Sequence, residues 1–189
     1  TGSSVCTDCA AGLFSAGTGT TSCEVCPAGR FTDTIGNFEC RPCALGTFNE
    51  MGGSQNCTRC PSGKFNNQEG LTSCGPCPAG SFIPEGAAEG VCLKCGLGTF
   101  STDESSTSCQ DCPVGRFQDI PGSTGCQLCP AGNFTNEARQ SACAGCPLGE
   151  FSSASGTTAC SRCPEGTYAG KVATSTCSSC EPGRHAPGE

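Results

Sequence analysis

Cysteine is the residue of this chain whose chemistry is most informative, and it occurs in a single spacing. The 22 cysteines of the 189 residues form C-x-x-C pairs that follow one another every 17 residues, with one step of 18. The pairs begin at Cys6, Cys23, Cys40, Cys57, Cys74, Cys92, Cys109, Cys126, Cys143, Cys160 and Cys177. A fixed short period predicts a repeat array. We therefore expect residues 1–189 to form one continuous array that is part of a longer chain.

Three kinds of chemistry use C-x-x-C pairs. Redox catalysis needs one exposed pair at a helix N-terminus, and eleven pairs without a helical pattern argue against it. Zinc takes two pairs for each tetrahedral site, and eleven pairs leave one over. Structural disulfides are the favoured interpretation, and they require an oxidising compartment.

The linkage of the disulfides has two reasonable solutions, since a bond within one pair would be strained. Joining first cysteine to first and second to second would produce a 34-residue alternation, which the sequence lacks. Joining the second cysteine of one pair to the first of the next makes all repeats equivalent, and we favour it. This scheme links Cys9–Cys23, Cys26–Cys40, Cys43–Cys57, Cys60–Cys74, Cys77–Cys92, Cys95–Cys109, Cys112–Cys126, Cys129–Cys143, Cys146–Cys160 and Cys163–Cys177. It leaves Cys6 and Cys180 without partners.

Each repeat reads C-x-x-C-P-x-G-x-F in its first half. The glycine, named here the repeat glycine, indicates a positive φ or a close backbone approach. It stands at Gly12, Gly29, Gly46, Gly63, Gly80, Gly98, Gly115, Gly132, Gly149, Gly166 and Gly183. Two residues later comes an aromatic ring, which we expect to form a small core, with His185 in that place in the last repeat. A second glycine in six repeats, such as Gly53, predicts a turn.

The fold expected from this pattern is a small disulfide-rich repeat without helix. Each 17-residue unit should form a short irregular β-hairpin, with strands near G-x-F-x and just before the following cysteine. Eleven such units would build an elongated rod or superhelix in which each repeat contacts only its neighbours. Leu45, Leu97 and Leu148 recur in every third repeat. That recurrence has two interpretations: duplication of a three-repeat block, or a superhelix or binding face with that period.

Composition excludes several functions. Leu, Ile, Val and Phe are too few for the core of an ordinary domain, and the single histidine provides no catalytic set, so we expect no enzyme and no cofactor. A net charge of −7 disfavours binding to nucleic acid. No apolar stretch is long enough for membrane insertion in this segment.

Glycosylation is a further expectation for an extracellular chain. Two sequons occur, at Asn56 and Asn133, and strand alternation would turn Asn133 outward, which makes it the better candidate. Hydroxyl-rich stretches predict O-glycosylation. Its candidates are Ser101, Thr102, Ser105, Ser106, Ser152, Ser153, Thr157 and Thr158.

The motif C-P-x-G-x-F followed by C-x-x-C resembles the ephrin-receptor-like cysteine repeat. It is also similar to single-disulfide submodules of tumour necrosis factor receptor ectodomains and to repeats of protist surface and flagellar-hair (mastigoneme) proteins. The resemblance covers residues 6–183 and implies a secreted or cell-surface, disulfide-stapled array. It does not imply one activity.

Two functions are consistent with these features, and a third is remote. The first is a structural rod that forms or coats an extracellular, glycosylated filament or surface appendage, with neighbouring structural chains or copies of itself as partners. The second is a receptor or adhesion ectodomain that binds a protein ligand. The remote alternative is a zinc-structured cytosolic protein. The structural rod is favoured because no other kind of module interrupts the array.

Overall fold

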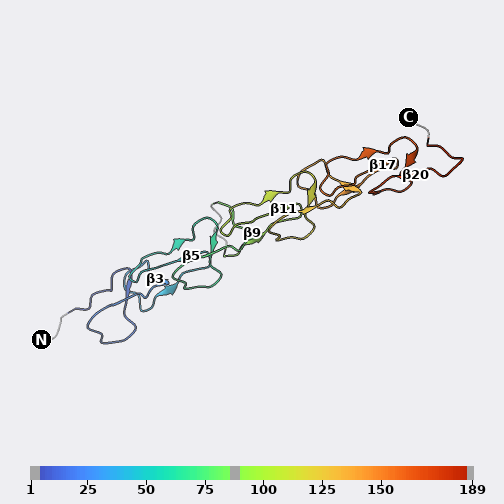
Figure 1. Ribbon diagram of the computed structural model, residues 1–189. Helices are drawn as coiled ribbons and strands as arrows, with labels where there is room; N and C mark the ends of the chain where they lie inside the picture. Colours follow the sequence, from blue (N-terminus) through green and yellow to red (C-terminus); the bar gives the residue numbers. More distant parts are fainter. Residues whose placement is uncertain (1–4, 86–89, 187–189) are drawn as a thin grey trace. The chain divides into compact units, whose positions relative to one another are not determined.

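The computed structural model describes residues 5–85 and 90–186 (Figure 1). This part of the chain contains twenty strands of two residues each and no helix. The odd-numbered strands are β1 (Leu13–Phe14), β3 (Arg30–Phe31), β5 (Thr47–Phe48), β7 (Lys64–Phe65), β9 (Ser81–Phe82), β11 (Thr99–Phe100), β13 (Arg116–Phe117), β15 (Asn133–Phe134), β17 (Glu150–Phe151) and β19 (Thr167–Tyr168). The even-numbered strands are β2 (Glu24–Val25), β4 (Arg41–Pro42), β6 (Thr58–Arg59), β8 (Gly75–Pro76), β10 (Leu93–Lys94), β12 (Gln110–Asp111), β14 (Gln127–Leu128), β16 (Ala144–Gly145), β18 (Ser161–Arg162) and β20 (Ser178–Ser179).

Each odd-numbered strand pairs with the following even-numbered strand in an antiparallel hairpin. In the first hairpin Leu13 lies opposite Val25 and Phe14 opposite Glu24. A tight turn precedes the odd strand, and its glycine has φ of +84° at Gly12. The amide of Cys26 donates to the carbonyl of Gly12 at 3.0 Å, which ties the next cysteine pair to this turn. The predicted disulfide-rich hairpin repeat without helix is confirmed.

The second strand of each hairpin lies elsewhere than the sequence predicted. It consists of the two residues inside the C-x-x-C motif, such as Glu24 and Val25, and not of the residues before the first cysteine. The residues before the cysteine have another partner: the carbonyl of Asn37 accepts from the amide of Ser15, in the preceding repeat, at 3.1 Å. Because their backbone groups bond across repeats, they do not extend the hairpin.

Ten disulfides each join the second cysteine of one pair to the first cysteine of the next, which is the linkage favoured from the sequence. Nine of them close a separation of 14 residues, and Cys77–Cys92 closes one of 15. Cys6 and Cys180 are free thiols.

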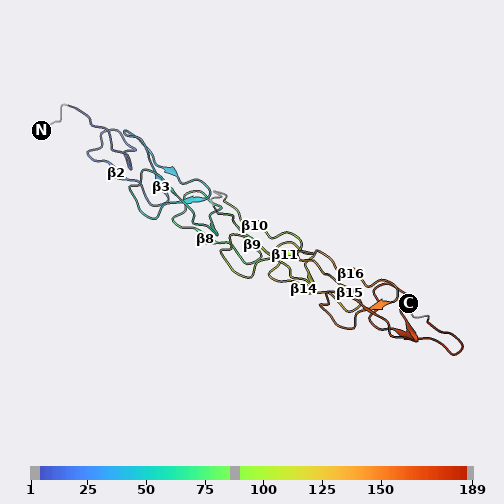
Figure 2. The same cartoon turned by 90° about the horizontal axis from the view of Figure 1, so that it is seen from above.

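The chain divides into two compact units. One comprises Thr1–Pro78, Phe82–Leu93 and Ser105–Thr107, and the other comprises Ala79–Ser81, Lys94–Glu104 and Ser108–Glu189. Within each unit the hairpins follow one another in sequence order, as the two views of Figure 1 and Figure 2 agree in showing. The division runs through the loops closed by Cys77–Cys92, the longer one, and by Cys95–Cys109.

The buried interior of the units consists mainly of cysteine sulfur and polar side chains, with Ile83 and Ala169 as apolar members. The second cysteine of most pairs is completely buried, as at Cys26, Cys43, Cys77, Cys95, Cys112, Cys129 and Cys146. The residue after the aromatic ring, named here the inner residue, is also buried. The inner residues with less than a tenth of their surface exposed are Thr32, Asn49, Asn66, Ile83, Ser101, Gln118, Thr135, Ser152 and Ala169.

The aromatic rings are less buried than predicted. The nine phenylalanines of the repeat pattern, from Phe14 to Phe151, are half-buried, Tyr168 is 50% exposed, and His185 is exposed. The guanidinium of Arg41 lies 5.2 Å from the centre of the Phe31 ring. Strand alternation explains the difference, because the inner residue points to the face opposite the ring. The position that is buried in each repeat is therefore the inner residue and not the aromatic ring before it.

Candidate functional site

The joint between consecutive repeats is the structural element that recurs along the chain. In the first joint three backbone amides donate across it: Gly12 to the carbonyl of Thr32 at 2.9 Å, Ser15 to Asn37 at 3.1 Å, and Gly36 to Cys9 at 2.8 Å. Equivalent bonds recur in later repeats, for example from Gly132 to Ser152 at 2.8 Å. Each repeat thus satisfies its backbone groups by bonding to the next one.

The repeat glycine packs against a residue two repeats further along. A Cβ on Gly12 would lie closer than 3.0 Å to the carbonyl oxygen of Gly53, far inside contact distance. The same approach recurs for Gly29 and Gly70, Gly63 and Ser105, Gly80 and Gly122, Gly98 and Arg139, Gly115 and Gly156, and Gly132 and Ala173. Both reasons proposed from the sequence hold, because these glycines also have positive φ. The expectation that repeats contact only their neighbours was wrong: contacts reach the second neighbour.

The partner of the repeat glycine, named here the turn residue, adopts the left-handed conformation wherever the structure describes it. It is Gly53, Gly70, Ser105, Gly122, Arg139, Gly156 or Ala173, and Gly19 and Gly36 hold the same place in the first two repeats. Six of these are the second glycines noted in the sequence. The other three, Ser105, Arg139 and Ala173, have φ of 59°, 63° and 58°. Sequence reasoning missed them because their residue types carry no turn signal, and only their place in the 17-residue register could have identified them.

At two of these turns the side chain lies against the residue just before the second cysteine of the preceding repeat's C-x-x-C motif. The guanidinium of Arg139 forms an ion pair with Asp111 at 3.7 Å. Ala173 lies against Gly145, where an added Cβ would come within 3.1 Å of the Ala173 methyl group. The residue that faces Arg139 is therefore an acid, and the residue that faces Ala173 is a glycine.

Two of the inner residues with amide side chains, Asn49 and Asn66, join consecutive repeats a second time, whereas Gln118 bonds to the Gly125 carbonyl within its own repeat. The Nδ2 of Asn49 donates to the carbonyl of Arg30, in the repeat before, at 3.1 Å, and its Oδ1 accepts from Ser54 Oγ at 2.8 Å. Asn66 donates in the same way to the carbonyl of Thr47. Smaller hydroxyl side chains bond two residues ahead instead, as Ser152 does to Ala154. No described buried side-chain oxygen or nitrogen lacks a partner.

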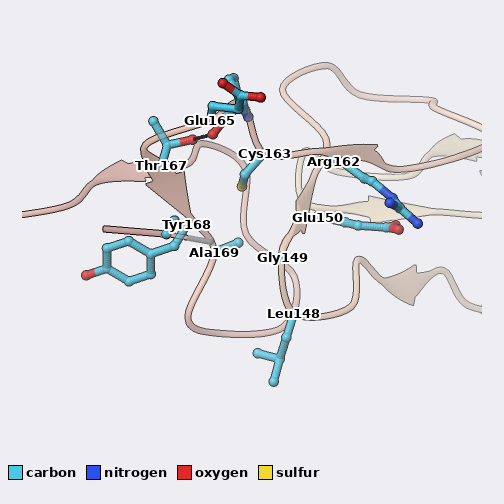
Figure 3. Close-up of a pocket in the computed structure, with 11 residues that line it drawn as sticks. Leu148, Gly149, Glu150, Arg162, Cys163, Glu165, Thr167, Tyr168 and Ala169 are labelled. Atoms are coloured by element: carbon cyan, nitrogen blue, oxygen red, sulfur yellow. Dashed lines mark hydrogen bonds between the residues drawn. The ribbon is translucent and has the colours of Figure 1, made fainter. Parts of the chain in front are cut away.

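A shallow depression of about 440 Å³ lies at the hairpin formed by β17 and β18 (Figure 3). Glu150 and Arg162, which face each other across that hairpin, lie side by side on one flank, and the Tyr168 ring is on the other. Leu148, Gly149, Cys163, Pro164, Glu165, Thr167, Ala169 and Ala186 complete the lining. Of the two hydroxyls in this lining, that of Thr167 donates to the carbonyl of Pro164 at 2.7 Å and the other belongs to Tyr168, and the sulfur of Cys163 is in a disulfide. This lining assembles no nucleophile with a base.

Metal binding finds no support in the described residues, where no three His, Cys, Asp or Glu side chains gather in a group that could hold an ion. Both cysteines of every pair that begins at Cys23 through Cys160 are in disulfides, so these pairs have no free thiol for zinc. Likewise, no helix in the described part of the chain could cross a membrane.

The candidate O-glycosylation residues divide by exposure. Thr102, Ser153 and Thr158 are exposed, while Ser105, Ser106 and Thr157 are half-buried. Ser101 and Ser152 are inner residues with 2% and 5% exposure, so their hydroxyls are inaccessible on the folded chain. These two were placed among the candidates because a hydroxyl-rich stretch does not indicate which hydroxyl points inward.

The two sequons also differ from expectation. Asn56 is exposed, whereas Asn133 is half-buried and its Nδ2 faces the carbonyl of Ala131 at 3.4 Å. The carbonyl of Asn133 accepts a hydrogen bond from Thr157 Oγ1 at 3.1 Å. The folded chain thus presents the Asn56 amide more openly than the Asn133 amide, the reverse of the order given by alternation.

The leucines of every third repeat are exposed. Leu45, Leu97 and Leu148 have 49%, 50% and 65% of their surface accessible. The joints do not explain the threefold recurrence, because the same backbone bonds occur in repeats with and without a leucine.

Comparison with known families agrees with this geometry. The family model described as tyrosine-protein kinase ephrin type A/B receptor-like matches residues 1–39, 35–70, 53–90, 85–125 and 122–158. The chain belongs to this ephrin-receptor-like family. No curated protein matches the chain. The ephrin-receptor-like repeats and the regular disulfides indicate an extracellular disulfide-rich protein, and the repeat itself is a non-catalytic module.

Proposed function

We propose that this ephrin-receptor-like array is a non-enzymatic structural protein that forms or coats a glycosylated extracellular filament or cell-surface appendage. The observation that supports the proposal is the repetition of one joint. Each repeat bonds to the next through Gly12-type amides and packs on the second neighbour through the repeat glycine. A fold that extends by adding identical joints is suited to covering length.

Lateral partners would contact the exposed surface, where single apolar side chains stand among polar ones. Leu45, Leu97 and Leu148 offer contacts at a three-repeat spacing to a neighbouring chain or a second copy. Sugars on Thr102, Ser153 and Thr158 would cover the polar turns between them.

The test is imaging of the source cell with an antibody against this array, together with glycopeptide mapping of the native protein. We expect label along fibres or appendages, and sugar on Thr102, Ser153 or Thr158 but not on Ser101 or Ser152. Label confined to the plasma membrane of a signalling cell, with no fibre, would contradict the proposal.

A receptor or adhesion ectodomain is the second candidate, favoured by the family and by the same exposed leucines. Capture of a defined protein ligand that is lost in a Leu45→Ser, Leu97→Ser, Leu148→Ser variant would support this function. The matched control replaces exposed Val172, which lies outside that series.

A further inference from the structure

We infer that the array acts as a tether of limited extension. A pulling force crosses each repeat through its disulfide and bypasses the loop that the disulfide closes. The inference rests on the proposed structural role only in that filaments and surface stalks are pulled. What supports it is the order of the disulfides along the chain, together with the place of the strands relative to them.

Consecutive disulfides are separated by one C-x-x-C motif. The bond Cys9–Cys23 is followed, after the link Cys23–Cys26, by the bond Cys26–Cys40. A force along the chain passes through that three-residue link and then across the next disulfide. The loop closed by the disulfide lies outside this path, and it carries no tension once the links are taut.

The path is short. A three-residue link spans at most about 11 Å. The two Cα atoms joined by a disulfide are 5.7 Å apart, or 5.8 Å in Cys112–Cys126. A taut repeat is therefore about 17 Å long, whereas the whole repeat without the disulfide would reach about 60 Å. Each disulfide thus withholds about 40–45 Å of chain from extension.

The loop also supports the link. All even-numbered strands are the interiors of links, and each pairs with the odd-numbered strand of the loop before it, as Val25 does with Leu13. The amide at the end of the link, Cys26, bonds to Gly12 of the same loop at 3.0 Å. The links are therefore held extended before any force is applied, and little slack remains in them.

The joints determine what happens at low force. Three backbone bonds and the packing of a repeat glycine must be lost before two repeats separate. Once they are lost, the covalent path limits further lengthening. The hydrogen bonds and packing of the joints therefore resist a weak pull, and the covalent path of links and disulfides limits the extension under a stronger pull. Neither property depends on how the two units are placed.

The experiment is to stretch single molecules of the whole chain between handles at its two ends. In the oxidised protein we expect the stretched length to stop at about 17 Å per repeat, however many repeats open together. After addition of a dithiol reductant at constant force, steps of about 40–45 Å should appear, up to one per disulfide. In each step a thiolate of the reagent displaces one cysteine sulfur, the reagent closes its own disulfide, and two cysteine thiols are released. An oxidised protein that stretches well beyond about 17 Å per repeat would overturn the inference.

A matched pair of variants removes cysteines inside and outside this path. Cys112→Ser with Cys126→Ser should add one step of about 40–45 Å without reductant. Cys6→Ser with Cys180→Ser removes the two free thiols and should add none. If the first variant does not fold, the reduction series on the unaltered chain still decides. Failure of the imaging test would leave these step lengths unchanged, so the two proposals can fail separately.

Discussion

A Cβ on Gly132 would lie closer than 3.0 Å to the carbonyl oxygen of Ala173, which is two repeats further along the chain. Gly132 and Ala173 both have positive φ, at 84° and 58°. The pair therefore combines a conformation and a contact that each favour glycine, and the two effects can be separated by mutation.

Gly132→Ala should loosen the joint by about 3 kcal/mol, because the new methyl adds overpacking to left-handed strain. The measurement is hydrogen exchange at the Ala173 amide, which donates to Cys146 at 2.9 Å. Gly166→Ala is the matched control, since Gly166 has φ of 76° but nothing within 4 Å of its added Cβ. The control should cost about 1 kcal/mol, from strain alone. Equal effects of the two changes would mean that the second-neighbour contact contributes nothing.

Ala173→Gly should stabilise its repeat by about 0.5–1 kcal/mol, because it removes left-handed strain from a residue with a Cβ. Ala154→Gly, at an exposed bend without positive φ, should destabilise by about 0.5–1 kcal/mol through lost chain entropy. Thermal unfolding of the two variants should shift in opposite directions. A common direction would contradict the left-handed assignment of Ala173.

Asn49→Ala should destabilise by about 1–3 kcal/mol, since the carbonyl of Arg30 and the hydroxyl of Ser54 both lose the buried side chain of Asn49 as partner. The comparison is Asn56→Ala, an exposed asparagine at which we expect a change of at most about 0.5 kcal/mol. Denaturant titration of the oxidised chains measures both. A small effect at Asn49 would show that its two hydrogen bonds are replaced by water without loss.

Two disulfides should be reduced first. In Cys60–Cys74 and Cys163–Cys177 both cysteines are half-buried, whereas seven of the other bonds contain a cysteine with 0% exposure. A reductant reaches a buried sulfur only when the repeat opens. Brief reduction, alkylation and peptide mapping should label these four cysteines before Cys112 or Cys129. Uniform labelling of all disulfides would contradict this order.

Much of the fold followed from the spacing of two residue types, cysteine and glycine. The regular period, the repeat glycine and the cysteine pairs were enough to predict hairpin repeats, because each enforces local geometry within one loop. The second strand and the second-neighbour packing could not be predicted in this way. Both depend on which repeat supplies the hydrogen-bond partner, and a periodic sequence looks the same whichever repeat that is.

The candidate site was less accessible to sequence reasoning. Nothing in the types Ser105, Arg139 and Ala173 distinguishes them as turn residues. Their left-handed conformation is imposed by hydrogen bonds from their amides to Cys77, Cys112 and Cys146. Likewise, Ser101 and Thr102 are adjacent hydroxyls just after β11, and nothing in their residue types distinguishes the buried one from the exposed one.

The uniform joint has a consequence for how such a gene can change. Because Gly12 meets Gly53 in the way that Gly115 meets Gly156, removing or duplicating one whole repeat would bring together new neighbours that fit as the old ones did. Copy number can therefore drift without loss of fold. The Arg139–Asp111 pair would be an exception, since the new neighbour of a displaced arginine need not be an acid.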